Sequence, residues 1–82
     1  MPYRYVVDQA ADESVSGLPR HEQRMLRDFF CHLANHPFVT SDQQVTDAGG
    51  RQNDVKGVGR LVVTYWIDHA SREVRICAVE FL

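Results

Sequence analysis

Hydrophobic and polar residues alternate along the last third of the chain, in two runs at residues 60–68 and 73–82. Both runs are rich in β-branched and aromatic residues, which suit the pleated surface of a sheet. A short polar stretch at residues 69–72 separates them. The pattern predicts two antiparallel strands joined by a hairpin, and we expect these strands to form the middle of the sheet.

Period-two counting gives each of these strands one apolar face and one mixed face. The mixed face carries arginine, threonine and tryptophan, so we expect helices to cover the apolar face and leave the mixed face free for function. The apolar face is predicted to hold Leu61, Val63, Tyr65, Ile67, Val74, Ile76 and Ala78, and the mixed face Arg60, Val62, Thr64, Trp66, Asp68, Glu73, Arg75, Cys77 and Val79.

Two helices are predicted in the first half of the chain. Asp8 is placed to cap the first helix, which should break near Gly17, and Pro19 suits the first position of the second. The second helix should end at Asn35, because the residue before Pro37 is pushed out of the helical region. One stripe of this helix is apolar and should cover the sheet. The stripe holds Met25, Leu26, Phe29, Phe30 and Leu33, and the polar remainder holds Arg20, Glu22, Gln23, Arg24, Arg27 and Asp28.

The remaining elements are shorter. Residues 3–7 are aromatic and β-branched and predict a first strand, and residues 43–47 predict a polar edge strand. The glycines of residues 48–51 indicate a turn, and residues 53–56 a strand that enters a bend at residues 57–59. The predicted fold is therefore α+β: one layer of two N-terminal helices on a twisted, mainly antiparallel sheet, in the order β-α-α-β-β-β-β. Its 82 residues support a single domain, residues 1–82.

Charge and composition narrow the choice of partners. Nine Lys and Arg against eleven Asp and Glu give a formal charge of −2, which argues against a general electrostatic grip on nucleic acid, so any such contact should be local. No apolar run approaches the length that spans a bilayer, and no signal sequence opens the chain. We therefore expect a cytoplasmic protein with no membrane partner.

Cysteine and histidine positions favour structural roles. Cys31 and Cys77 lie in apolar surroundings and should be free, buried thiols. His32 and His36 have the spacing of two metal ligands on a helix, but a zinc site also needs a third ligand. We therefore predict no metal and no cofactor. His69 follows Asp68, and such a pair could be a general base with the carboxylate that orients it, or simply two residues of a turn. Neighbouring residues of a strand point to opposite faces, which favours the turn.

The order of elements resembles that of the RelE/ParE toxin superfamily of bacterial toxin–antitoxin systems. The features that carry the resemblance are residues 33–37 at the helix end, the glycine bend before Arg60-Leu61-Val62, and Tyr65-Trp66-Ile67-Asp68 before a final hydrophobic strand. RelE-type members cleave messenger RNA in the ribosomal decoding site, and ParE-type members poison DNA gyrase. An antitoxin segment wraps and neutralises both types, so the resemblance implies a cognate antitoxin as partner.

The resemblance also implies site residues. The RelE-type mechanism uses basic residues to stabilise charge on the scissile phosphate and a tyrosine, histidine or carboxylate for proton transfer, without a metal. Arg60 matches the arginine that opens the family's central strand. The family's second cluster, in or after the last strand, is replaced here by Glu80-Phe81-Leu82, so the chain diverges from the pattern. The candidate catalytic residues are Arg60, Arg75 and Glu80, and the candidate binding residues are Trp66, Thr64 and Lys56.

Each candidate also has a plainer interpretation. Arg75 fits an ordinary ladder of ion pairs with Asp68 or Glu73, and Glu80 fits a solvated strand end.

The sequence and the resemblance lead to two hypotheses for the function of the protein. The first is a toxin-like component of a bacterial toxin–antitoxin system, a weak or degenerate ribosome-dependent mRNA endonuclease. The alternative is a non-enzymatic interaction module on the same fold, either a ParE-like binder of gyrase or a protein that binds an antitoxin or forms a homodimer.

Overall fold

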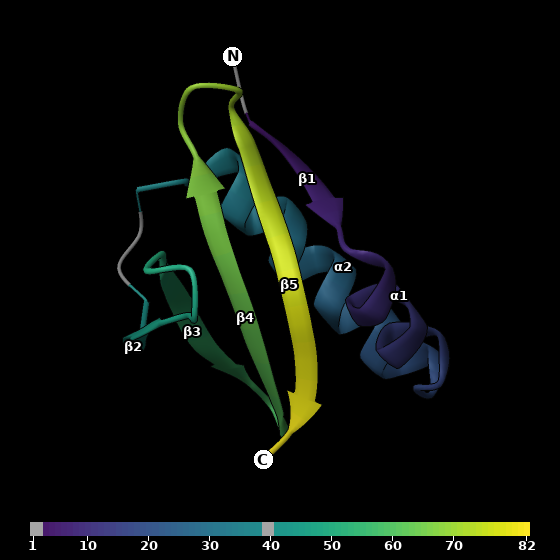
Figure 1. Cartoon of the computed structure of the whole chain (residues 1–82). Coiled ribbons are helices and arrows are strands. Elements are labelled where there is room, and N and C mark those ends of the chain that lie inside the picture. Colours follow the sequence, from purple (N-terminus) through teal and green to yellow (C-terminus); the bar gives the residue numbers. More distant parts are fainter. Residues whose placement is uncertain (1–2, 39–40) are drawn as a thin grey trace.

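The computed structural model describes residues 3–38 and 41–82, which form a five-stranded sheet with two helices (Figure 1). The strand order is β1-β5-β4-β3-β2, so the two C-terminal strands lie next to each other near the middle, as the alternating pattern predicts. The elements are β1 (Arg4–Val7), α1 (Gln9–Ser16), α2 (Arg20–Asn35), β2 (Gln43–Thr46), β3 (Gln52–Val58), β4 (Leu61–Asp68) and β5 (Glu73–Phe81). The predicted α+β order is therefore confirmed.

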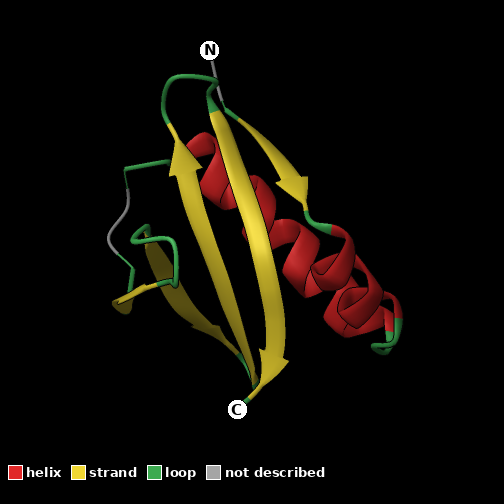
Figure 2. Cartoon of the chain, viewed as in Figure 1, coloured by secondary structure: helices red, strands yellow, loops and turns green. Residues whose placement is uncertain are grey.

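Three of the four strand pairings are antiparallel, and β1 pairs with β5 in parallel. A parallel pair needs a long crossover connection. Here α1 and α2 lie within that connection, and both helices pack on one side of the sheet (Figure 2). No helix of the described chain covers the other side, which we call the open face.

The apolar stripe of α2 packs on the sheet, as predicted. Leu26, Phe30 and Leu33 are buried, while Met25 and Phe29 are partly buried against the same cluster. Full burial of one such side chain stabilises the fold by roughly 1.5–3 kcal/mol, so this stripe outweighs any surface ion pair. The sheet's contribution to the core is Leu61, Val63, Tyr65, Val74, Ile76 and Val79.

A β-bulge changes the predicted faces of β5. The register between β4 and β5 shifts between Thr64 and Tyr65, so Thr64 pairs with Ala78 but Tyr65 pairs with Ile76, and Cys77 is left over. An extra residue in one strand reverses the alternation beyond it. Val79, predicted on the mixed face, is therefore buried in the core opposite Val63, and the prediction that Ala78 faces the helices was wrong.

The turns follow the glycines, with one correction. Gly50 and Gly59 have φ of 83° and 60°, a region that residues with a side chain rarely adopt. The predicted bend at residues 57–59 is narrower than expected, because β3 continues to Val58 and only Gly59 and Arg60 form the turn. Arg60 is thus a turn residue, and its predicted place on the strand beside Trp66 was wrong.

Two smaller expectations also change. Asp8 occupies the N-cap position of α1, but its side chain makes no capping hydrogen bond. Cys31 is exposed and Cys77 is half-buried at the bulge, so the expectation of two buried thiols was wrong for Cys31. No helix within residues 3–38 and 41–82 combines the length and hydropathy needed to span a bilayer.

Candidate functional site

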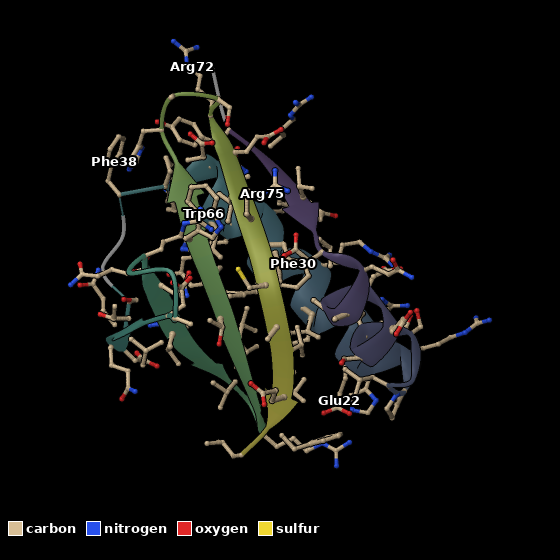
Figure 3. All side chains as sticks on the ribbon, viewed as in Figure 1. Glu22, Phe30, Phe38, Trp66, Arg72 and Arg75 are labelled. Atoms are coloured by element: carbon tan, nitrogen blue, oxygen red, sulfur yellow. The ribbon has the colours of Figure 1, made fainter. Side chains whose placement is uncertain are left out.

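The open face carries a cluster of one indole and two guanidinium groups, which we call the tryptophan site. Trp66 on β4 lies directly opposite Arg75 on β5, and Figure 3 shows the two side chains next to each other. Arg51, from the β2–β3 turn, places its guanidinium carbon 4.0 Å from the centroid of the Trp66 ring. A cation over an indole face is attracted by the ring's negative potential. The fold therefore brings Trp66 and Arg75 together, as predicted, and adds Arg51.

Arg75 is held by carboxylates within this site. Its Nη1 donates to Oε1 of Glu73 at 3.1 Å, and Nη2 lies 3.8 Å from Oδ1 of Asp8. Glu73 also accepts from Nε and Nη2 of Arg4 at 2.9 and 2.6 Å. The hydrogen bonds from Arg4, with Arg75 contributing less, lower the pKa of Glu73 below its ordinary value. The ladder of ion pairs expected between Arg75 and Glu73 is thus present, and an anion would have to compete with it.

The other predicted binding residues are more scattered. Thr64 shares the open face with Trp66, two positions along β4. Lys56 lies opposite Val63 and therefore on the helix side of the sheet, where its Nζ pairs with Oδ1 of Asp42 at 3.1 Å. The structure does not bring Lys56 to the tryptophan site. Lys56 faces the helices because residues directly opposite each other in neighbouring strands share a face, and its partner Val63 is in the core.

Glu80 and Arg60 lie at the opposite end of β4 and β5 from Trp66. Glu80 is exposed and pairs with Val62, which confirms the solvated strand end. Arg60 precedes Trp66 by six residues, about 20 Å of extended strand. The three candidate catalytic residues therefore do not form one cluster.

Arg60 makes a two-point ion pair with a residue of α2. Its Nε donates to Oε2 of Glu22 at 2.7 Å and its Nη2 to Oε1 at 2.6 Å, while the guanidinium carbon lies 4.8 Å from the Phe81 ring centroid. Glu22 is only 4% exposed. It lies in the first turn of α2, and Figure 3 shows this end of the helix near the C-terminus of the chain. Hydrogen bonding to Arg60, opposed by desolvation, lowers the pKa of Glu22, and the same bond raises the pKa of Arg60.

Tyr65 belongs to the core and not to the open face. It is buried, its ring meets Phe29 edge to face with centroids 6.3 Å apart, and burial raises the pKa of its hydroxyl to about 12, with the carboxylates of Asp54 and Asp42 contributing. A phenol with this pKa is a poor proton donor or base near neutral pH. Tyr65 therefore acts as a packing residue.

The hairpin between β4 and β5 shows the expected turn chemistry. Oδ1 of Asp68 accepts hydrogen bonds from the backbone nitrogens of Ala70 and Ser71 at 3.1 and 3.2 Å. His69 points elsewhere: its Nδ1 lies 2.9 Å from the Tyr3 hydroxyl. Asp68 and His69 therefore do not form a catalytic pair.

His32 of α2 and His36, the residue that caps this helix, do not come together with a third metal ligand in the described chain. The rings of His32 and His36 lie 4.7 Å apart, one helical turn from each other. Among residues 3–38 and 41–82, no three His, Cys, Asp or Glu side chains converge in a way that would hold a metal ion.

Sequence reasoning missed two residues that shape these sites. Glu22 was grouped with the polar surface of α2, although it lies four residues before Leu26 and thus on the apolar stripe, a signal that could have revealed its burial. Arg51 was placed in a turn without a role. Its contact with Trp66 depends on the path of the β2–β3 turn, which no local pattern indicates.

Comparison with known proteins bears on the fold. No protein-family model matches the sequence, and no curated protein matches it either. A chain in the crystal structure of the toxin–antitoxin complex RelBE2 from Mycobacterium tuberculosis is similar with a TM-score of 0.83 and 18% identity, and the match covers 100% of both chains. A chain of the archaeal RelE–RelB complex from Pyrococcus horikoshii OT3 gives 0.80 and 17%, covering 99% of this chain and 96% of that one. The resemblance predicted from the sequence is confirmed at the level of architecture, and the chain has a RelE-like toxin fold.

Proposed function

We propose that this protein is the toxin-like component of a bacterial toxin–antitoxin system and that an antitoxin is its partner. The observation that carries the proposal is the extent of the fold likeness, which spans essentially the whole of each chain. The similar chains come from complexes of RelB with RelE. An uncovered sheet face and two edge strands leave this chain surface on which a wrapping partner can bind.

Within that role, we propose a weak ribosome-dependent mRNA endonuclease that needs no metal. Arg60 would stabilise charge on the scissile phosphate. Glu22 already accepts hydrogen bonds from Nε and Nη2 of Arg60, so a phosphate has to compete with this carboxylate for the guanidinium. The proposed activity is weak for this reason.

A second candidate function is a non-enzymatic interaction module on the same fold. The specific observation that favours it is the pairing of both candidate catalytic arginines, Arg60 with Glu22 and Arg75 with Glu73. Arginines held in this way serve the fold first. A module of this kind would bind its antitoxin or gyrase without cleaving RNA.

Induced expression in a bacterium, with protein and DNA synthesis followed separately, distinguishes these functions. The endonuclease predicts translation arrest that is lost in Arg60→Ala and kept in Arg24→Ala, a control that removes an exposed arginine of α2. Arrest of replication instead of translation would indicate gyrase. Normal growth together with a stable complex, formed on co-expression with the product of the neighbouring reading frame, would indicate the interaction module.

The antitoxin proposal has its own test. Co-expression with that neighbouring product should yield a complex of defined stoichiometry on size exclusion and should restore growth wherever the chain alone arrests it. If the two proteins elute separately and growth is not restored, the chain is not a toxin-like partner of that protein.

A further inference from the structure

Two histidines at the end of α2 offer half of the ligands that a zinc ion takes. His32 lies in the last turn of the helix and His36 caps it, and both side chains are exposed. Residues four apart lie on one face of a helix, and two histidines at this spacing can bind the same ion. We propose that Zn²⁺ binds this pair and that a second copy of the chain supplies the other two ligands. We call the four imidazoles the zinc bridge.

The distance between the two rings fits a shared ion. Zinc lies about 2.0–2.1 Å from an imidazole nitrogen and therefore about 3.2 Å from the centroid of that ring. Two rings that bind one ion at an angle of about 90–110° then have centroids about 4.5–5.2 Å apart. The centroids of His32 and His36 are 4.7 Å apart, with the ring planes tilted by 38°. The pair can therefore bind zinc without a change in the backbone.

The backbone holds His36 next to His32, although His36 is already past the last helical residue. Its N–H donates to the carbonyl oxygens of His32 at 2.9 Å and Leu33 at 3.2 Å, which fixes the end of the helix. Within residues 3–38 and 41–82 neither imidazole makes a hydrogen bond, whereas the ring of His69 is bonded to Tyr3. In the described chain the ring nitrogens of the pair are thus available to a metal, and imidazole suits zinc better than magnesium or calcium.

The remaining ligands have to come from another molecule. In the part of the chain that the structure describes, no three His, Cys, Asp or Glu side chains converge on one point. Zinc held by protein side chains alone is almost always tetrahedral with four ligands. Two copies related by a two-fold axis through the metal place two histidines each on the ion, and two-fold dimers are the commonest homo-oligomers. A second copy therefore supplies what one chain lacks.

The charges near the pair also suit a second copy and a cation. The sequence has no Asp, Glu, Lys or Arg from residue 29 to residue 38, so two copies meet here without repulsion between like charges. Asp28 is exposed one turn before His32 on the same face, and no cation of the described residues lies within ion-pair distance of it. Four neutral imidazoles leave the charge of zinc uncompensated, and one Asp28 from each copy offsets it.

The zinc bridge leaves the open face uncovered. Both helices pack on the other side of the sheet (Figure 2), and the histidine pair lies at the exposed end of α2. A pair of copies joined through α2 can therefore still present the tryptophan site to solvent. The inference does not depend on the proposed toxin role, so the purified chain alone is enough to test it.

The test measures stoichiometry and mass together. Purified chain without a histidine tag, kept in a reducing agent, is titrated with zinc sulfate in a calorimeter, and its mass is followed by size exclusion with light scattering. We expect about one zinc ion for every two chains. The mass should double with zinc, return to that of the monomer with EDTA and stay unchanged with Mg²⁺. A monomer in the presence of zinc, or a dimer that persists in EDTA, would overturn the inference.

Variants assign the ligands. His32→Ala and His36→Ala should each remain monomeric at zinc concentrations that pair the unaltered chain, with the fold checked by circular dichroism. His21→Ala is the matched control, because His21 is exposed on α2 but has no histidine four residues away, and it should pair normally. Cys31→Ser removes the exposed thiol beside His32 and should also pair normally. Pairing that survives both changes at the proposed ligands, or that Cys31→Ser abolishes, would show that zinc binds elsewhere.

Discussion

Arg60 and Glu22 are joined by two hydrogen bonds of 2.7 and 2.6 Å, although they lie 38 positions apart in the sequence. The pair ties the β3–β4 turn to the start of α2, at the edge of the core. The carboxylate is almost fully buried while the guanidinium remains more than half exposed. A buried carboxylate without a partner is costly, so Glu22 depends on Arg60 more than Arg60 depends on Glu22.

This asymmetry predicts an order of stability. Arg60→Ala should lower the melting temperature more than Glu22→Gln, because the first change leaves a buried charge unpaired and the second removes the charge. Thermal unfolding followed by circular dichroism at pH 7 measures both. Equal melting temperatures in the two variants would contradict the asymmetry.

Glu22→Gln also separates a structural role of Arg60 from a catalytic one. If Arg60 acts on phosphate, removal of the competing carboxylate should raise mRNA cleavage several-fold while the fold is retained. Ribosomes programmed with a defined message and assayed by primer extension provide the measurement. Arg24→Ala in the Glu22→Gln background is the matched control, and Arg60→Ala in that background should abolish the gain.

Acid should weaken the protein through its paired carboxylates. Hydrogen bonds from Arg60 and Arg4 hold the pKa values of Glu22 and Glu73 below the ordinary 4.5. Because the pKa of each carboxyl is lower in the folded state, its ion pair contributes its full stabilisation above about pH 4.5. That contribution is lost as the pH falls through the folded-state pKa. Urea unfolding should give a nearly constant free energy from pH 7 to about pH 5 and a decline below it. Glu22→Gln should make the decline shallower, and an unchanged acid limb would contradict this.

The elements that could be predicted from the sequence are those whose pattern is local. The stripe of α2, the alternation of β4 and the glycine turn at residues 48–51 each depend on neighbouring residues, and all three are confirmed. The site depends on pairings between distant residues. The contact of Arg51 with Trp66 and that of Arg60 with Glu22 follow from how the turns approach β4 and α2, and period-two counting carries no information on either.

The β-bulge at Cys77 could not be predicted from the alternating pattern either, because one extra residue in β5 exchanges the faces on which the residues beyond it lie. Val79 is buried opposite Val63, whereas Ala78 pairs with Thr64 on the open face. Val79→Ser should therefore lower the free energy of unfolding by roughly 2–3 kcal/mol, since it removes apolar burial and buries a hydroxyl. Ala78→Ser should change it by no more than about 0.5 kcal/mol. Urea denaturation of both variants tests the bulge, and the reverse order would restore the unbroken alternation.

The packing of α2 on the sheet has a direct test. Leu26 is fully buried in the core, and Leu26→Ala should cost about 2–5 kcal/mol through lost burial and the cavity left behind. Leu82→Ala is the control, because Leu82 is 85% exposed and should contribute little. Equal losses in urea denaturation would mean that α2 does not cover the sheet as described.

The two cysteines should differ in reactivity, because the bulge that displaces Cys77 also half-buries it. Burial raises the pKa of the Cys77 thiol above its ordinary 9.0, with Asp8 adding to the effect, while Cys31 is exposed on α2. The thiolate is the reactive form, so Cys77 should react several-fold more slowly with a disulfide reagent at pH 8. Cys31→Ser should leave only the slow phase, and Cys77→Ser only the fast one. The slow phase should become faster as pH rises toward the raised pKa, and in urea both thiols should react at one rate. A single fast rate for both thiols in the folded protein would place Cys77 outside the sheet.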